Sequence, residues 1–310
     1  MKEVSAPEER SQSTADDRAA AQELATGDQN PSQHPWQRYV ALGDSFTEGI
    51  GDPDPNRPGY HRGWADRVAQ ELAQGAPNFA YANLAVRGKL INQIRDEQVA
   101  PALELKPDLI TLCAGGNDVI RPGSDPDETA RTLDTVVQIL SITGATVVLF
   151  NGPDVRDTPM MGSIRGKVAI FNENVRTVAK RHDAVVADMW SLRELTAKEM
   201  WDEDRLHFSP LGHHTIARMV LDTLNVPHDL SPVEPTPPSE RSWREARVDD
   251  AIWARHHLFP WVIRRLRGRS SGDGLTAKRP DIEPLFGGSM PLGSAGGGDE
   301  PQEMTRRNSV

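Results

Sequence analysis

The chain has 310 residues with 35 Lys and Arg against 45 Asp and Glu, and its formal net charge of −10 disfavours general nucleic-acid binding, which needs a basic surface. Its single cysteine, Cys113, excludes an internal disulfide framework and fits a reducing compartment. Because residues 1 to 35 hold no apolar run typical of a secretory signal, and no segment approaches the ~18 consecutive apolar residues of a membrane span, we expect a cytoplasmic protein.

Residues 1 to 35 are rich in Glu, Asp, Gln, Ser and Ala and carry few large apolar side chains. Such a segment cannot bury enough surface to offset the entropy lost on ordering, so we predict a disordered N-terminal tail. From residue 36 to 227, short apolar runs rich in β-formers alternate with longer segments of helical period. They predict strands at 38–42, 79–85, 109–114, 146–150 and 184–189, and helices at 63–74, 91–103, 127–143, 164–182 and 210–224.

This alternation predicts the fold class of the central segment. Strands that are apolar on both faces and separated by helices are typical of a parallel sheet covered on each side. We therefore predict that residues 36 to 227 form one α/β domain with a five-stranded parallel sheet in a three-layer α/β/α arrangement.

The composition changes again after this domain. Residues 228 to 239 are Pro-rich and predict an extended linker, and residues 240 to 268 predict a basic amphipathic helix that Pro260 kinks or interrupts. Two roles are open for this C-terminal helical extension: weak docking on an anionic membrane surface or a partner, or packing of its aromatic face against the domain. We favour the second. Residues 269 to 310, rich in Gly, Ser and Pro, predict a second disordered tail.

A serine in the first loop of the domain is a candidate nucleophile. The first predicted strand stops at Gly43, and Ser45 follows two residues later, at the strand end where open α/β sheets bind their ligands. Because Gly, Asp and Ser are also common turn residues, this stretch alone fits a turn equally well.

Two later loops hold the groups that such a serine would need. Asp204 precedes His207 by three residues, a spacing that lets the carboxylate hold one imidazole nitrogen while the other acts as a base. After the third predicted strand, Gly115 and Gly116 lead to Asn117, whose side-chain amide is a candidate donor to an oxyanion. Each motif alone is more simply a loop. Together, all fall at one edge of the predicted sheet or in the last loop.

In this order, the blocks Gly43-Asp44-Ser45, Gly88, Gly115-x-Asn117-Asp118 and Asp204-x-x-His207 resemble the GDSL, or SGNH, hydrolase superfamily. The resemblance implies a flavodoxin-like sheet and hydrolysis of ester bonds. It implies that Ser45 is the nucleophile, His207 the general base and Asp204 its orienting carboxylate. The oxyanion hole would comprise the N–H groups of Ser45 and Gly88 and the amide of Asn117, with supporting roles for Asp44, Gly116 and Asp118. Phe46 stands where the family name has leucine.

Two competing motifs lack residues that they require. Asp52-x-Asp54-x-Asn56 begins like a calcium loop, but Arg57 occupies the glycine position, and the stretch from Gly162 to Lys167 is one residue short of a phosphate-binding loop. We therefore expect neither a metal nor an organic cofactor.

The expected substrate is a small-molecule acyl ester, and the sequence indicates no obligate partner. Two alternatives on the same fold stay open: a deacetylase or thioesterase, and a non-catalytic lipid- or glycan-binding module. The complete set of reactive side chains argues against the module.

Overall fold

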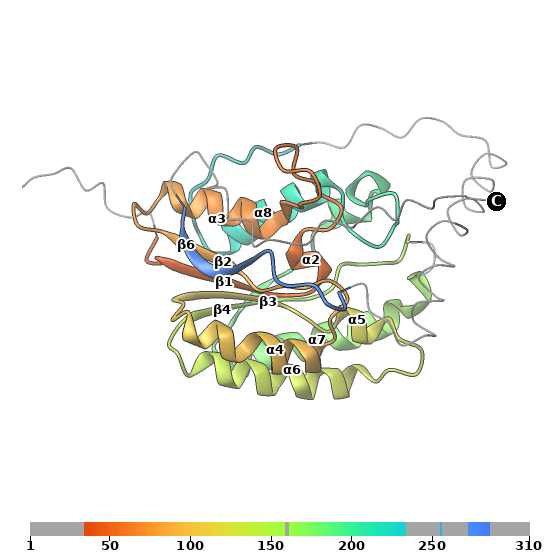
Figure 1. Cartoon of the computed structure of the whole chain (residues 1–310). Coiled ribbons are helices and arrows are strands. Elements are labelled where there is room, and N and C mark those ends of the chain that lie inside the picture. Colours follow the sequence, from red (N-terminus) through yellow and green to blue (C-terminus); the bar gives the residue numbers. More distant parts are fainter. Residues whose placement is uncertain (1–33, 159–160, 234–254, 256–271, 286–310) are drawn as a thin grey trace, which may run out of the picture.

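A computed structural model describes residues 34–158, 161–233, 255 and 272–285 (Figure 1). The strands are β1 (Arg38–Gly43), β2 (Ala80–Asn83), β3 (Leu109–Cys113), β4 (Thr146–Phe150), β5 (Val185–Ala187) and β6 (Arg279–Pro284). The α-helices are α2 (Ser45–Glu48), α3 (Gly63–Gln74), α4 (Ile91–Glu104), α5 (Gly116–Val119), α6 (Pro126–Ser141), α7 (Arg165–His182) and α8 (Pro210–Thr223). Short 3-10 helices cover Gly162–Ile164, Arg193–Thr196 and Lys198–Met200.

The strands form one sheet in the order β5-β4-β3-β1-β2-β6. The pairs from β5 to β2 are all parallel, which confirms the predicted five-stranded parallel sheet. Because β1 lies between β2 and β3, the chain reverses its direction of winding between β1 and β3. The loops that follow these two strands therefore diverge at the point where doubly wound sheets bind their ligands.

Helices cover both faces of the sheet, as the three-layer prediction requires (Figure 1). Residues of β1 alternate between the two cores because successive side chains of a strand point to opposite faces. Tyr39 and Ala41 pack with α3 and α8, whereas Val40 and Leu42 pack with α4, α6 and α7.

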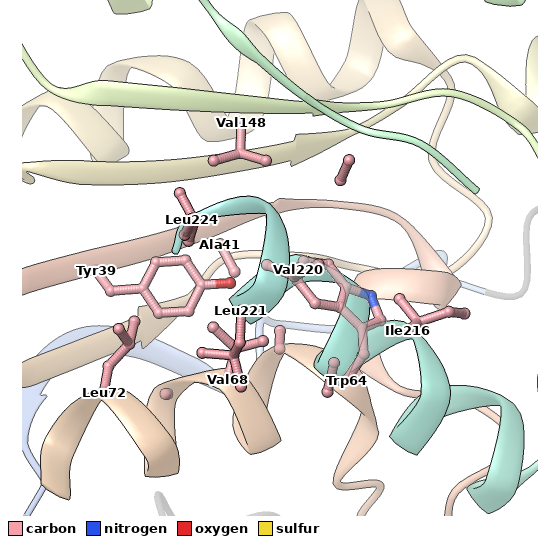
Figure 2. Close-up of a cluster of buried hydrophobic side chains, with 14 of the residues drawn as sticks. Tyr39, Ala41, Trp64, Val68, Leu72, Val148, Ile216, Val220, Leu221 and Leu224 are labelled. Atoms are coloured by element: carbon pink, nitrogen blue, oxygen red, sulfur yellow. The ribbon is translucent and has the colours of Figure 1, made fainter. Parts of the chain in front are cut away.

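Figure 2 shows the first of these cores, where α3 and α8 lie against the sheet. Trp64, Val68 and Leu72 recur every four residues along α3, so they share one helix face, and each is fully buried. This burial fixes α3 over β1, and it also fixes the loops that join α3 and α8 to the edge carrying the candidate site.

A sixth strand corrects the expectation of a disordered tail over residues 269 to 310. Residues 272–285 are ordered, and β6 pairs antiparallel with β2. Its sequence, Arg279-Pro-Asp-Ile-Glu-Pro284, has low strand propensity because it holds two prolines and three charged side chains. Tertiary contacts described below, and not local preference, place it on the sheet.

Other predicted boundaries fall partly outside the described residues. The N-terminal tail was placed at residues 1 to 35, but His34 is buried and its Nε2 lies 2.8 Å from the Leu72 carbonyl oxygen. Residues 1–33, the second half of the linker (234–239) and, except for Arg255, the basic segment 240 to 268 lie outside what the structure describes.

Candidate active site

The loop after β1 begins at a point of very close backbone approach. A Cβ atom added to Gly43 would lie 2.5 Å from the Cys113 carbonyl oxygen and 2.6 Å from Thr47 Oγ1, so only glycine fits here. The side chain of Gln98 makes two hydrogen bonds to this residue. Its Oε1 accepts from the Gly43 N–H at 2.9 Å, and its Nε2 donates to the Gly43 carbonyl at 2.8 Å. The position of Ser45 is thus set by the end of β1.

Ser45 is the first residue of the short helix α2 and is half-buried. Asp44 caps this helix, accepting a hydrogen bond from the Phe46 N–H at 3.1 Å. The N–H of a first helical residue has no acceptor within its own helix. Ser45 therefore presents a hydroxyl and a backbone N–H at one place.

The second carboxylate oxygen of Asp44 accepts a bond from Asn117 Nδ2 at 2.9 Å, which joins the loops after β1 and β3. Burial raises the pKa of Asp44 to about 6; the Phe46 N–H, His207 and Asn117 lower it, and Asp118 raises it. Asn117 Nδ2 also donates to the Lys89 carbonyl at 3.1 Å. A primary amide has two N–H bonds, so donation to a substrate oxygen requires one of these acceptors to give way.

The turn that holds His207 is organised around the Asp204 carboxylate. Asp204 Oδ1 accepts bonds from the Leu206 and His207 N–H groups, each at 2.9 Å, and Oδ2 lies 2.5 Å from His207 Nδ1. Arg205 has a left-handed backbone (φ 56°), which reverses the chain between acid and histidine. Because Nδ1 is engaged by Asp204, proton exchange with a nucleophile would use Nε2.

Electrostatics agree with this arrangement. Burial by itself would raise the pKa of Asp204, but its hydrogen bonds with the His207 ring and with two backbone N–H groups outweigh burial and lower the pKa to about 2. Asp204 is therefore an anion at any ordinary pH, and it stabilises a positive charge on His207 when one forms.

Two observations bring the serine loop and the histidine turn together. His207 is among the charges that influence the pKa of the buried Asp44, the neighbour of Ser45. A Cβ atom added to Gly51 would lie 2.1 Å from the carbonyl oxygen of Phe208, the residue after His207. The loops after β1 and before α8 thus pack directly on one another.

Gly88 lies in the loop after β2, with a left-handed backbone (φ 76°). Its neighbour Arg87 is tied to α2, since Glu48 Oε2 accepts the Arg87 N–H at 2.7 Å and Glu48 Oε1 accepts from Arg87 Nε at 2.9 Å. The helix that starts at Ser45 therefore also holds the loop that carries Gly88.

The supporting residues predicted from the sequence have separate positions. Asp118 Oδ2 accepts from the Ile91 N–H at 3.0 Å and so fixes the start of α4 to the loop after β3. Gly116 is exposed at the start of α5, and a Cβ atom added to it would meet no heavy atom within 4 Å. Position 116 therefore has room for a larger side chain. Position 115 does not, because a Cβ atom added to Gly115 would lie 2.6 Å from the Phe171 ring.

Sequence reasoning missed several residues that hold this site, among them Glu48, Arg87, Asn83 and Gln98. Buried Asn83 donates from Nδ2 to the Thr47 carbonyl at 2.9 Å, which fastens α2 to β2. Another residue that sequence reasoning missed is the buried His213. It bridges the Ile50 carbonyl and the Trp64 N–H, and burial lowers its pKa to about 4, so it is neutral. The sequence offered one signal for these residues, since Arg87 directly precedes the motif glycine Gly88.

Among the described residues, no group of three His, Cys, Asp or Glu side chains is placed to hold a metal ion. Within the same part of the chain, no helix has the length and apolar character needed to cross a membrane.

The structure is thus a doubly wound α/β sheet in which the loop that carries Ser45 packs on the turn that holds the Asp204–His207 pair. A serine, a histidine and a carboxylate are the groups that hydrolases with a serine nucleophile use. The sequence model of the GDSL-like Lipase/Acylhydrolase family matches residues 41–215, more than half of the chain. The chain belongs to this family, which confirms the resemblance found in the sequence. Membership of this family makes the protein a hydrolase of esters.

Solved structures with the same fold include several hydrolases. The α/β hydrolase LAE5 from the metagenome of Lake Arreo is 22% identical, with a TM-score of 0.52 over 61% of this chain and 95% of that one. TesA is 21% identical, with a TM-score of 0.52 over 61% and 98% of the two chains. A catalytic mutant of Axe2, an acetylxylan esterase from Geobacillus stearothermophilus, is 19% identical, with a TM-score of 0.52 over 61% and 94%. No curated protein sequence gives a match to this chain.

Proposed function

We propose that the protein hydrolyses small or medium acyl esters through a covalent acyl-enzyme on Ser45. The observation that carries the proposal is the Asp204–His207 bond of 2.5 Å to Nδ1, in a turn that packs on the serine loop. A serine hydroxyl is a weak nucleophile until a base takes its proton, and this pair supplies an oriented base.

In the first step, His207 Nε2 accepts the hydroxyl proton as Ser45 Oγ attacks the ester carbonyl. The negative charge that develops on the carbonyl oxygen is stabilised by the N–H groups of Ser45 and Gly88 and by the Asn117 amide. For Asn117 to donate, one of its N–H bonds moves from Asp44 or Lys89 to the oxyanion. The imidazolium then protonates the leaving alcohol.

In the second step, water attacks the acyl-enzyme. His207 takes a proton from the water, and the same donors stabilise the second oxyanion. Collapse of this intermediate releases the acid and returns the proton to Ser45 Oγ, so that atoms and charge balance over the cycle. Asp204 keeps its negative charge throughout and holds Nδ1 protonated.

A fluorophosphonate probe and p-nitrophenyl acetate together test the nucleophile. We expect the wild-type protein to be labelled on Ser45 and to hydrolyse the ester, and Ser45→Ala to be unlabelled and at least ~1,000-fold slower in kcat. Ser191→Ala, a change at an exposed serine, is the matched control and should behave as wild type. Full activity in Ser45→Ala would overturn the proposal, and a stable wild-type protein that neither reacts nor turns over would favour a binding module.

Substrate preference within this class is a separate measurement. A series of p-nitrophenyl esters from acetyl to dodecanoyl, with matched thioesters, distinguishes an esterase from a lipase or thioesterase of the same fold. We expect the highest kcat/KM at the short and medium oxygen esters. The cytoplasmic location and the lack of an obligate partner stay predictions.

A further inference from the structure

The ordered C-terminal segment 272–285 lies beyond the part of the chain that matches the family, and it returns to the edge of the catalytic domain. At one end, the Leu285 N–H donates to the Phe79 carbonyl at 2.8 Å, and the Leu285 side chain is 3% exposed. The residues before Leu285 form β6, which pairs with β2, the strand that leads into the Gly88 loop.

Lys278 fixes the middle of this segment to the start of α3. Its Nζ donates to the carbonyl oxygens of His61 and Arg62 at 3.1 and 2.8 Å, and to Asp66 Oδ2 at 3.0 Å. Both side chains of the Lys278–Asp66 pair are at most 10% exposed. A buried pair with additional hydrogen bonds is costly to break, so the segment is held in register.

The other end of the segment touches the backbone of the Gly88 loop. A Cβ atom added to Gly272 would lie 2.0 Å from the Arg87 carbonyl oxygen and 3.0 Å from Val86 Cγ1. Gly272 is buried and its backbone is not in the left-handed region, so space alone requires glycine.

The contacted oxygen belongs to a particular peptide group. The Arg87 carbonyl and the Gly88 N–H share one rigid plane, in which they point in opposite directions. Whatever limits the direction of the carbonyl therefore also limits the direction of the N–H. On the preceding peptide, the Arg87 N–H is held by Glu48. The 87–88 peptide thus lies between α2 on one side and Gly272 on the other.

We propose that Gly272 is a positioning residue for the oxyanion hole, and that segment 272–285 completes the active site by holding the Gly88 N–H in its donating direction. The inference rests on the proposed function, since it gives the Gly88 N–H a role in the reaction. It assigns a catalytic consequence to a part of the chain that the family motif does not include.

The direct test is Gly272→Ala, assayed for kcat, KM, thermal unfolding and rate of fluorophosphonate labelling. The added methyl group displaces the Arg87 carbonyl and turns the Gly88 N–H away from the oxyanion. We expect kcat to fall on the order of 10- to 100-fold with KM nearly unchanged, less than the ~100- to 1,000-fold cost of removing an oxyanion donor. The labelling rate should fall in parallel, because phosphonylation develops the same negative charge.

Two further variants separate positioning from stability. Leu285→Ala loosens the far end of the segment without touching Arg87, so it should lower the unfolding temperature and leave kcat near wild type. Gly166→Ala adds a methyl group where no heavy atom lies within 4 Å, so it should change neither the unfolding temperature nor kcat. If kcat falls in Leu285→Ala as much as in Gly272→Ala, the segment only stabilises the domain and the proposal is wrong.

A third variant covers the case in which Gly272→Ala does not fold. Lys278→Gln removes the anchor between Gly272 and β6 and so frees the Gly272 end of the segment, which Leu285→Ala leaves anchored. The proposal therefore requires a lowered kcat in the folded Lys278→Gln protein, and a wild-type kcat there would overturn it. Ser45→Ala distinguishes the two levels of inference. If Ser45→Ala is inactive and Gly272→Ala is fully active, the proposed esterase function is supported and the positioning role of Gly272 is wrong.

Discussion

The turn that carries His207 and the loop that carries Ser45 are held in place by different means. In the turn, Asp204 is bonded to the ring and backbone of a residue only three positions away. In the loop, the residues from the end of β1 to α2 are bonded to residues distant in sequence, including Gln98, Asn83 and Asn117. One half of the site is nearly self-contained, and the other half depends on the whole sheet edge.

Their carboxylates differ in the same way. Hydrogen bonds with His207 overcome burial and lower the pKa of Asp204 to about 2, whereas burial raises the pKa of Asp44 to about 6. In the proposed mechanism, the Asp204 carboxylate faces an imidazolium, whereas the donors bonded to Asp44, the Phe46 N–H and the Asn117 amide, are neutral. The comparison indicates that Asp204 stabilises charge on His207, whereas Asp44 fixes the position of the Ser45 loop. Four substitutions test this difference.

Asp204→Asn should have the largest effect. An asparagine at this position offers an N–H to Nδ1 and so favours the wrong tautomer of His207, and we expect kcat to fall ~1,000- to 10,000-fold. The measurement is kcat for p-nitrophenyl acetate. Glu203→Gln, at the exposed neighbouring position, is the control, and equal activity in both variants would contradict a charge role for Asp204.

Asn117→Ala should have the next largest effect. It removes one oxyanion donor and the bond that joins the loops after β1 and β3, so we expect a ~100- to 1,000-fold loss in kcat. KM should change little, because the donor acts mainly in the transition state. An Asn56→Ala control changes an exposed loop asparagine. A loss confined to KM would assign Asn117 to ground-state binding instead.

The raised pKa of Asp44 should make the free energy of unfolding depend on pH. Its pKa is raised on folding, so its contribution to the free energy of unfolding is fully present below pH ~4 and is lost as the pH rises through about 6. The difference in unfolding free energy between wild type and the non-titrating Asp44→Asn should therefore shift in favour of wild type by roughly 2–3 kcal/mol from pH 7.5 to pH 4. Chemical denaturation at both values measures it, and no shift would mean that Asp44 is not buried as an acid.

Glu48→Gln should have the smallest effect. Glutamine keeps an acceptor for the Arg87 N–H but loses the charge that holds the guanidinium, so the Gly88 loop becomes less well fixed. A displaced donor costs less than a missing one, and we expect kcat to fall on the order of 10-fold. Glu97→Gln, at a more exposed ion pair, is the control. Unchanged kcat in both would show that Glu48 does not position Gly88.

The same contrast explains what could be predicted from the sequence. The strands and helices of the domain follow from local periodicity, and the predicted helix at 63–74 coincides with α3. The three-residue spacing of Asp204 and His207 allows a bond between them, and the order of the motif blocks along the chain selected this pair.

Partners across the sheet could not be predicted in this way. Glu48 and Arg87 are 39 positions apart, and nothing in either local sequence pairs them. The strand β6 was missed for a related reason, because its prolines and charges oppose strand formation, whereas distant contacts through Lys278, Leu285 and the edge of β2 stabilise it.

Those prolines have a consequence for contact between molecules. Without β6, the backbone of β2 would end the sheet as an open row of hydrogen-bonding groups, a template for strands of other chains. With β6 in place, the outermost strand carries Pro280 and Pro284, which lack N–H groups, and the exposed charge of Asp281. The segment that contacts the Gly88 loop therefore ends this side of the sheet with a strand that pairs poorly with a further strand. At high protein concentration, this disfavours edge-to-edge association of molecules.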